Sequence, residues 1–248
     1  KTPKDWDITT NAKPEEIQQL FPDSFYENDF GTVGVKTESE DPALKVVEIT
    51  PYRVESTYSN ARHPDSVSFS DNLEDDLKRR DFTMNAIAYN PVKDELVDPY
   101  KGQEAIRLKS IVAVGTPHDR FSEDALRMLR AIRLSAELDF TIESETADAI
   151  AEHAQLLEKV SRERIHDEFV RIIASDTPMQ ALFIAQRLGL LTYIVPELEE
   201  GIGCDQNQAH SFDVFEHSLR SLQHAADKNY SFEVRLAALL HDVGKPKS

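Results

Sequence analysis

Apolar and polar residues change their spacing part-way along the chain. In roughly the first 115 residues, apolar positions form short runs between polar turns, and the runs at residues 31–36 and 44–50 predict strands. Residues 14–20 predict a short helix with acidic residues in its first turn. Beyond about Ser122, apolar residues recur every three to four positions, which indicates helices. Further helices are expected near residues 143–157, 161–174, 178–188, 211–226 and 231–240.

The first of these helices, from Ser122 to about Leu138, should have two different faces. At 100° per residue, one face is apolar and is expected to pack inward: Leu126, Leu129, Ile132 and Ala136. A second face brings together three charged residues and a leucine: Glu123, Arg127, Arg130 and Leu134. Asp124 lies three residues from Arg127, so the two are expected to be neighbours on the helix surface. This spacing fits two interpretations. The two side chains could form an ordinary ion pair, or they could form hydrogen bonds with the edge of a nucleotide base.

Composition narrows the class of protein. The chain has 248 residues, 40% of them hydrophobic and 29% charged, as expected for a soluble globular protein of two or three structural units. Its single cysteine, Cys204, cannot form an internal disulfide, which favours a reducing, cytoplasmic location. No stretch has the roughly 18 apolar residues of a membrane helix. A net charge of −17 argues against a wholly basic nucleic-acid binder, so any RNA contact should use local patches.

Acidic residues in two predicted strands suggest a metal site. Asp5 and Asp7 are two residues apart, and such residues point to the same face of a strand. Carboxylate oxygens are the ligands that Mg²⁺ prefers, and phosphoryl transfer uses such ions. Glu48 lies in an apolar strand run, either on a solvated face or as a third ligand. Two surface acids with no ligand remain the simplest alternative for Asp5 and Asp7.

A cationic run follows at residues 78–86, KRRDFTMNA. Arg79 and Arg80 could hold the oxygens of a nucleoside triphosphate, because guanidinium groups bind phosphate in a bidentate way. Asp81 and Asn85 are four residues apart, so on a helix both could face a ribose. A charged surface helix with no ligand is the alternative.

A second candidate metal site lies near the end of the chain. His241 and Asp242 follow a predicted helix and could bind one metal ion together. His217, on an earlier predicted helix, is a candidate third ligand.

Several motifs occur in an order that resembles bacterial class II tRNA nucleotidyltransferases and poly(A) polymerases. The runs that carry the resemblance are DWD at residues 5–7, EIT at 48–50 followed by YR at 52–53, RRDFTMNA at 79–86, DPYKG at 98–102, EDALR at 123–127 and ERIHDE at 163–168. The segment with His217, His241 and Asp242 resembles the start of an HD-type phosphohydrolase domain. We expect Glu163, Arg164 and Glu168 to form salt bridges between helices.

The resemblance implies a fold and a division of the chain. It implies an α+β fold in which a polymerase β-like head with a small mixed or antiparallel sheet precedes an all-helical neck and a helical HD-type segment. The expected parts are residues 1–117, 118–200 and 201–248. Both ends are expected to be incomplete, because the glycine-rich segment before the first motif and the last HD-domain ligand are not present.

The resemblance also implies roles for individual residues. Asp5, Asp7 and Glu48 would hold two Mg²⁺ ions, and Arg79 and Arg80 the triphosphate. Asp81 and Asn85 would contact the ribose, while Asp124, Arg127 and Arg130 would read the base. His217, His241 and Asp242 would hold a divalent transition metal.

The activity implied is template-independent addition of CCA, or of the terminal A, to tRNA 3′ ends from ATP and CTP. The loop around residues 56–64 resembles that of CCA- and A-adding members, which disfavours addition of CC alone. A poly(A) polymerase and an HD-type metal phosphohydrolase with a non-catalytic head are the alternatives, and a non-catalytic RNA-binding protein is a further one. The sequence predicts no membrane partner and leaves the oligomeric state open.

Overall fold

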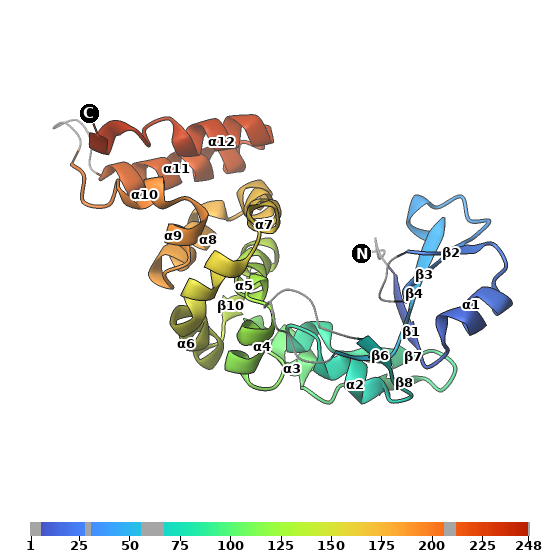
Figure 1. Ribbon diagram of the computed structural model, residues 1–248. Helices are drawn as coiled ribbons and strands as arrows, with labels where there is room; N and C mark the ends of the chain where they lie inside the picture. Colours follow the sequence, from blue (N-terminus) through green and yellow to red (C-terminus); the bar gives the residue numbers. More distant parts are fainter. Residues whose placement is uncertain (1–5, 28–30, 56–66, 206–211, 248) are drawn as a thin grey trace. The chain divides into compact units, whose positions relative to one another are not determined.

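A computed structural model describes residues 6–27, 31–55, 67–205 and 212–247 (Figure 1). The described residues form two compact units, which divide between Arg80 and Asp81. Unit 1 contains the described residues up to Arg80, and unit 2 contains those from Asp81 onward.

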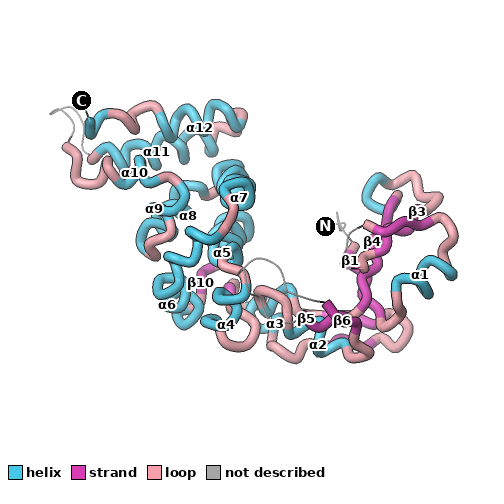
Figure 2. Tube along the Cα trace, viewed as in Figure 1, coloured by secondary structure: helices cyan, strands magenta, loops and turns pink. Residues whose placement is uncertain are grey.

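Unit 1 is built on a four-stranded mixed sheet in the order β1-β4-β3-β2. Figure 2 draws the strands in magenta. Its strands are β1 Asp7–Thr10, β2 Ser24–Tyr26, β3 Val33–Lys36 and β4 Val46–Pro51. β1 runs parallel to β4, while β3 runs antiparallel to both β4 and β2. Beside this sheet are helices α1, Pro14–Leu20, and α2, Leu73–Lys78, and the antiparallel pair β5, Arg53–Glu55, and β6, Val67–Phe69.

One face of the four-stranded sheet is covered by α1. Ile17 of α1 forms a buried cluster with Val33, Val35 and Ile49 of the two central strands. Successive side chains of a strand point to opposite faces, so Glu48 and Gly34 face away from this cluster. The sheet therefore has an apolar face under α1 and an opposite face that carries Glu48.

Unit 2 is mainly helical. Its helices are α3 Gly102–Arg107, α4 Pro117–Glu123, α5 Leu126–Leu138, α6 Ser144–His153, α7 Arg162–Ala174, α8 Pro178–Arg187, α9 Leu191–Ile194, α10 Pro196–Glu199, α11 Val214–Asp227 and α12 Phe232–Leu240. Short strands form two pairs, antiparallel β7 Ala88–Asn90 with β8 Glu95–Val97, and parallel β9 Ser110–Ile111 with β10 Thr141–Ile142. Short 3₁₀ helices occur at Pro42–Leu44 in unit 1 and at Thr83–Asn85, Ala154–Lys159 and Lys245–Lys247 in unit 2.

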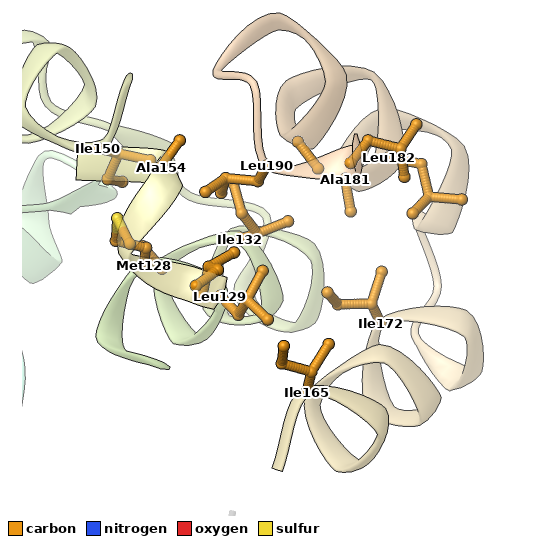
Figure 3. Close-up of a cluster of buried hydrophobic side chains, with 14 of the residues drawn as sticks. Met128, Leu129, Ile132, Ile150, Ala154, Ile165, Ile172, Ala181, Leu182 and Leu190 are labelled. Carbon is orange, nitrogen blue, oxygen red and sulfur yellow. The ribbon is translucent and has the colours of Figure 1, made fainter. Parts of the chain in front are cut away.

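Helix α5 runs through the core of unit 2 and packs against α7 and α8. Met128, Leu129 and Ile132 of α5 lie among apolar side chains of the α6 region, α7 and α8 (Figure 3). The predicted inward face is buried as expected, since Leu126, Leu129, Ile132 and Ala136 are all nearly inaccessible. α11 and α12 pack side by side at the end of the chain (Figure 1).

The predicted α+β class, with a small mixed sheet followed by helices, is confirmed. The helix predicted at residues 14–20 has those bounds, and the predicted strands correspond to β3 and β4. The predicted start of a helix at Ser122 is wrong, because Ser122 lies inside α4. Asp124 has an extended backbone that ends α4, and its Oδ1 accepts a hydrogen bond from the Leu126 backbone N–H, 3.1 Å, at the start of α5.

The three-part division at residues 117 and 200 remains a prediction. The compact units of the described residues divide at residue 80. No helix in the described ranges has the length and apolar character needed to cross a membrane.

Candidate functional site

Two carboxylates lie side by side on the sheet face opposite α1. Asp7 of β1 is the register partner of Glu48 of β4 in the parallel pair. Register partners point to the same face, and neighbouring strands are about 4.8 Å apart, so both carboxylates can reach one cation. Both residues are exposed. The position of Asp5 lies outside the described residues.

The neighbour of Glu48 on β3 is a glycine. Gly34 of β3 pairs with Glu48, and a Cβ at Gly34 would come within 2.6 Å of the Phe25 ring. Glycine therefore leaves room for the ring of Phe25 on β2, which is the register partner of Gly34. Thr9 and Thr50 are the next register pair along the same face, and the Thr9 hydroxyl donates to the Thr50 carbonyl, 3.0 Å.

Arg79 and Arg80 at the end of α2 are both held by one buried acid. The Asp76 side chain is 0% exposed, and its Oδ1 accepts hydrogen bonds from Nε, 3.0 Å, and Nη2, 2.7 Å, of Arg79. Its Oδ2 accepts a longer bond from Arg80 Nη2, 3.4 Å. Asp76 therefore helps to position both guanidinium groups. Burial, followed by the charge of Asp76, raises the pKa of nearby Tyr52.

Asp81 begins unit 2 as a buried acceptor. Its Oδ1 accepts from the Phe82 backbone N–H, 2.8 Å, and from the Asn85 amide, 3.0 Å. Its Oδ2 accepts from Nε and Nη2 of Arg130 on α5, each at 2.7 Å. Burial alone would raise the pKa of Asp81, but Arg130 and the hydrogen bonds outweigh it and hold that pKa below its ordinary value.

Asp81 and Asn85 do not lie on one α-helix. The segment leaves α2 at Lys78 and forms a 3₁₀ helix only at Thr83–Asn85. Phe82 instead has an extended backbone and makes a β-bridge with Ala113. Asp81 and Asn85 nevertheless meet through their side chains.

The turn at residues 98–102 packs against this segment. The Asp98 carboxylate accepts from the backbone N–H groups of Gly102, 2.6 Å, and Gln103, 2.9 Å, at the start of α3. A Cβ at Gly102 would lie 2.2 Å from the Thr83 carbonyl oxygen, so only glycine permits this close approach. Lys101 has φ 59°, the left-handed conformation that glycine adopts at lower cost.

Charged side chains at the α4–α5 junction are paired in a way that the sequence did not predict. Arg127 Nη1 donates to Glu123 Oε2, 2.7 Å, and to the Arg120 carbonyl, 3.2 Å, while Arg120 also pairs with Glu123. Arg127 is buried rather than exposed on the helix surface. Asp124 accepts instead from Arg164 Nη2 on α7, 2.7 Å. Arg130, with a side chain 36% exposed, is the most accessible of these base-reading candidates.

Two of the three predicted interhelical salt-bridge residues are confirmed. Arg164 joins α7 to Asp124, and Glu168 of α7 accepts from Arg133 Nε on α5, 2.6 Å. The Arg133 and Glu168 side chains are only 4% and 8% exposed. These pairs fix α5, which carries Arg127 and Arg130, against α7.

His217, His241 and Asp242 meet at the ends of α11 and α12. His217 Nε2 is 3.2 Å from His241 Nε2, and Asp242 Oδ2 is 3.6 Å and 3.2 Å from these two nitrogens. These separations are near the about 3.3 Å between ligands of a tetrahedral ion with bonds of about 2.05 Å. His241 Nδ1 lies 2.9 Å from the Ala238 carbonyl, which assigns its proton there and leaves Nε2 as the ligand atom.

Lys245 also contacts this cluster. Its Nζ is 2.6 Å from Asp242 Oδ2, where a metal ion would bind. Burial raises the pKa of Asp242, but the Lys245 hydrogen bond and the nearby charges outweigh this and lower it overall. The three residues thus form a candidate metal-binding group of two nitrogens and one oxygen.

Comparison with known families agrees with this arrangement. A poly(A) polymerase head domain matches residues 1–112, a probable RNA- and SrmB-binding site of polymerase A matches residues 139–202, and an HD domain matches residues 214–248. The CCA-adding enzyme of Enterococcus faecalis is 48% identical over 170 residues, 68% of this chain and 40% of that protein. The chain belongs to the class II nucleotidyltransferase family.

Further members support the assignment. The CCA-adding enzyme of Listeria monocytogenes (strain EGD-e) is 42% identical over 196 residues, 78% of this chain and 48% of that protein. The solved CCA-adding enzyme of Bacillus stearothermophilus in complex with CTP has a TM-score of 0.70 at 32% identity, over 95% of this chain and 56% of that one. This chain spans about half the length of the curated family members it matches.

The structure brings only some of the predicted nucleotidyltransferase residues together. Asp7 lies beside Glu48, and Asp81 contacts both Asn85 and Arg130. The roles in metal, triphosphate, ribose and base binding remain predictions.

Two supporting residues were not found from the sequence. Asp76 was missed, although its spacing of three and four residues before Arg79 and Arg80 is the helical signal for such pairs. Arg120 was missed because its partner Glu123 was placed at the start of a different helix.

Proposed function

We propose that the protein to which this chain belongs adds nucleotides to tRNA 3′ ends, either CCA or the terminal A, using ATP and CTP. The observation that carries this proposal is the pairing of Asp7 with Glu48 on an exposed sheet face. A nucleotidyltransferase head that had lost its catalytic role would not be expected to retain both Asp7 and Glu48. Its relatives named CCA-adding enzymes favour tRNA as the acceptor over the RNA of a poly(A) polymerase.

The acidic face would hold the catalytic ions. Asp5, Asp7 and Glu48 offer carboxylate oxygens, which suit two Mg²⁺ ions. When bound, such ions neutralise the triphosphate and activate the attacking 3′ hydroxyl. The protein's own contribution is to keep the carboxylates in register, which the β1–β4 hydrogen bonds do.

Arg79 and Arg80 would bind the triphosphate. Their shared partner Asp76 is buried, so both guanidinium groups are positioned before a nucleotide arrives. The loss of side-chain freedom on binding is then smaller than for two mobile arginines.

The nucleoside would be read by residues of unit 2. Arg130 is held by Asp81, and Asp124 by Arg164, so a donor and an acceptor for a base edge are both fixed in place. Arg127, held by Glu123, would complete the set, and Asn85 with Asp81 would contact the ribose. Rigid donors and acceptors could choose between ATP and CTP without a nucleic-acid template.

The HD segment carries the second candidate activity. His217, His241 and Asp242 would bind a divalent transition metal and could support phosphate-ester hydrolysis. We propose a functional division at residues 117 and 200, which the matched ranges 1–112, 139–202 and 214–248 support. We further propose a cytoplasmic location, which the single Cys204 supports.

The test offers the full-length protein tRNAs that end before CCA, after C and after CC, with each nucleotide separately, and sequences the products. Addition that stops after one CCA supports the proposal, and addition only to the CC-ending tRNA identifies an A-adding enzyme. Long adenylate tails on RNA that lacks a tRNA fold would support the poly(A) alternative. Metal-dependent phosphate release with no nucleotide addition would support the HD alternative.

A further inference from the structure

Two histidines and a glutamate meet in unit 2 outside every motif described above. His118 is in the first turn of α4, and Glu152 and His153 are the last two residues of α6. One ligand atom from each of the three lies within 4.8 Å of the other two. We propose that His118, Glu152 and His153 bind one divalent transition-metal ion, such as Zn²⁺, that links α4 to α6.

The distances suit such an ion after small side-chain rotations. His118 Nδ1 is 3.5 Å from Glu152 Oε2, close to the about 3.3 Å between two tetrahedral ligands at bond lengths of about 2.05 Å. The imidazole rings of His118 and His153 meet edge to face with centroids 5.1 Å apart. α4 and α6 pack against each other, so their backbones already hold the ligands together.

His153 carries a polar atom that needs a partner. Its Nδ1 is buried and has no hydrogen-bond partner among the described residues. A buried nitrogen without a partner destabilises the folded protein, and a bound ion or water would relieve that cost. Nδ1 is one of the two atoms through which an imidazole binds metal.

The chemical types of the three ligands indicate which class of ion would bind. Two imidazole nitrogens and one carboxylate oxygen favour Zn²⁺, Co²⁺ or Ni²⁺ over Mg²⁺ and Ca²⁺, which prefer oxygen ligands. Glu152 reduces the local positive charge, and the C-terminus of α6 adds negative potential beside His153. The side chains of His118 and Glu152 are 44% and 65% exposed, so the ion can enter from solvent.

A bound ion would join the start of α4 to the end of α6. The far end of α4 carries Arg120 and Glu123, which hold Arg127. An ion that fastens the near end of α4 to α6 would stabilise this arrangement without touching a nucleotide.

The test separates this cluster from the one at α11 and α12. In a His217→Ala/His241→Ala background, Zn²⁺ titration by calorimetry should show one saturable site, and saturation should raise Tm by about 5 °C. His118→Ala and His153→Ala should each weaken binding at least tenfold and abolish the rise in Tm. Co²⁺ absorption in the visible range should show nitrogen ligation that His118→Ala removes.

Matched variants keep the result interpretable. His166→Ala removes an exposed histidine elsewhere on unit 2 and should leave affinity unchanged. Glu152→Gln retains the side-chain shape and should weaken binding without changing the metal-free circular dichroism spectrum. Absence of a saturable site in the background protein would overturn the proposal, and so would His118→Ala and Glu152→Gln variants that bind Zn²⁺ as tightly as the background protein.

Discussion

The buried pair of Arg133 and Glu168 should contribute strongly to the stability of unit 2. Arg133→Met removes the cation and leaves the Glu168 carboxylate buried at 8% exposure. Breaking such a pair by removing one partner costs about 3–5 kcal/mol. We expect a value near 3 kcal/mol, because Glu137, the other partner of Arg133, is 29% exposed and retains Arg171 at 3.2 Å.

The double variant Arg133→Met/Glu168→Met should recover most of this loss. Replacing both charges by apolar side chains of similar size is often neutral, because no charge remains buried without a partner. Far-ultraviolet circular dichroism during urea unfolding measures the change, since most helices lie in unit 2. A loss of about 3 kcal/mol corresponds to a fall in Tm of about 6–12 °C.

An exposed pair provides the control. Arg107 and Glu104 are 71% and 53% exposed and 3.5 Å apart, so Arg107→Met should change stability by less than about 1 kcal/mol. If Arg133→Met is equally mild, or if the double variant is no more stable than Arg133→Met alone, the reasoning about the buried pair is wrong.

Three further predictions concern the turn at Lys101, the buried acid Asp81, and Asp76, which pairs with Arg79 and Arg80. Lys101→Gly should stabilise the protein by about 0.5–1 kcal/mol in urea unfolding, because φ is 59° there, whereas Lys45→Gly at φ −60° should destabilise it. The lowered pKa of Asp81 means that its stabilisation is present above the ordinary carboxyl pKa and is lost as pH falls through the folded value. In Asp81→Asn, the free energy of unfolding should therefore fall less steeply below about pH 4 than in the unmodified protein. The same pH dependence in both proteins would contradict this. Asp76→Asn should raise KM for ATP about tenfold, equivalent to about 1.4 kcal/mol, with a smaller change in kcat; an unchanged KM would show that Asp76 does not position the arginines.

Helical periodicity predicted the helices well because it is a local property. The apolar face of α5 is buried as its spacing indicates. The boundary was wrong because Ser122 and Asp124 are both residues that cap helices, and spacing alone does not choose between them. Pro117, at the first position of α4, is the local signal for the extra helix.

The arrangement of the acidic site was less predictable. Sequence spacing placed Glu48 in a strand but did not show which face of the sheet its side chain occupies. That face is set by pairing with β1, about 40 residues away along the chain. The partners of Asp81 and Asp124, Arg130 and Arg164, lie 49 and 40 residues away along the chain. Long-range packing sets these contacts, so residue spacing could suggest only the local pair of Asp124 with Arg127.

The central claim is that Asp7 and Glu48 hold the ions for nucleotide addition, and a rate measurement on tRNA ending in CC tests it most directly. Asp7→Ala and Glu48→Gln in the full-length protein should each reduce single-turnover AMP incorporation at least a thousandfold, with circular dichroism spectra unchanged. Glu38→Ala, at an exposed acid between β3 and β4, should retain the full rate. Incorporation by Asp7→Ala at a rate similar to that of Glu38→Ala would contradict the claim.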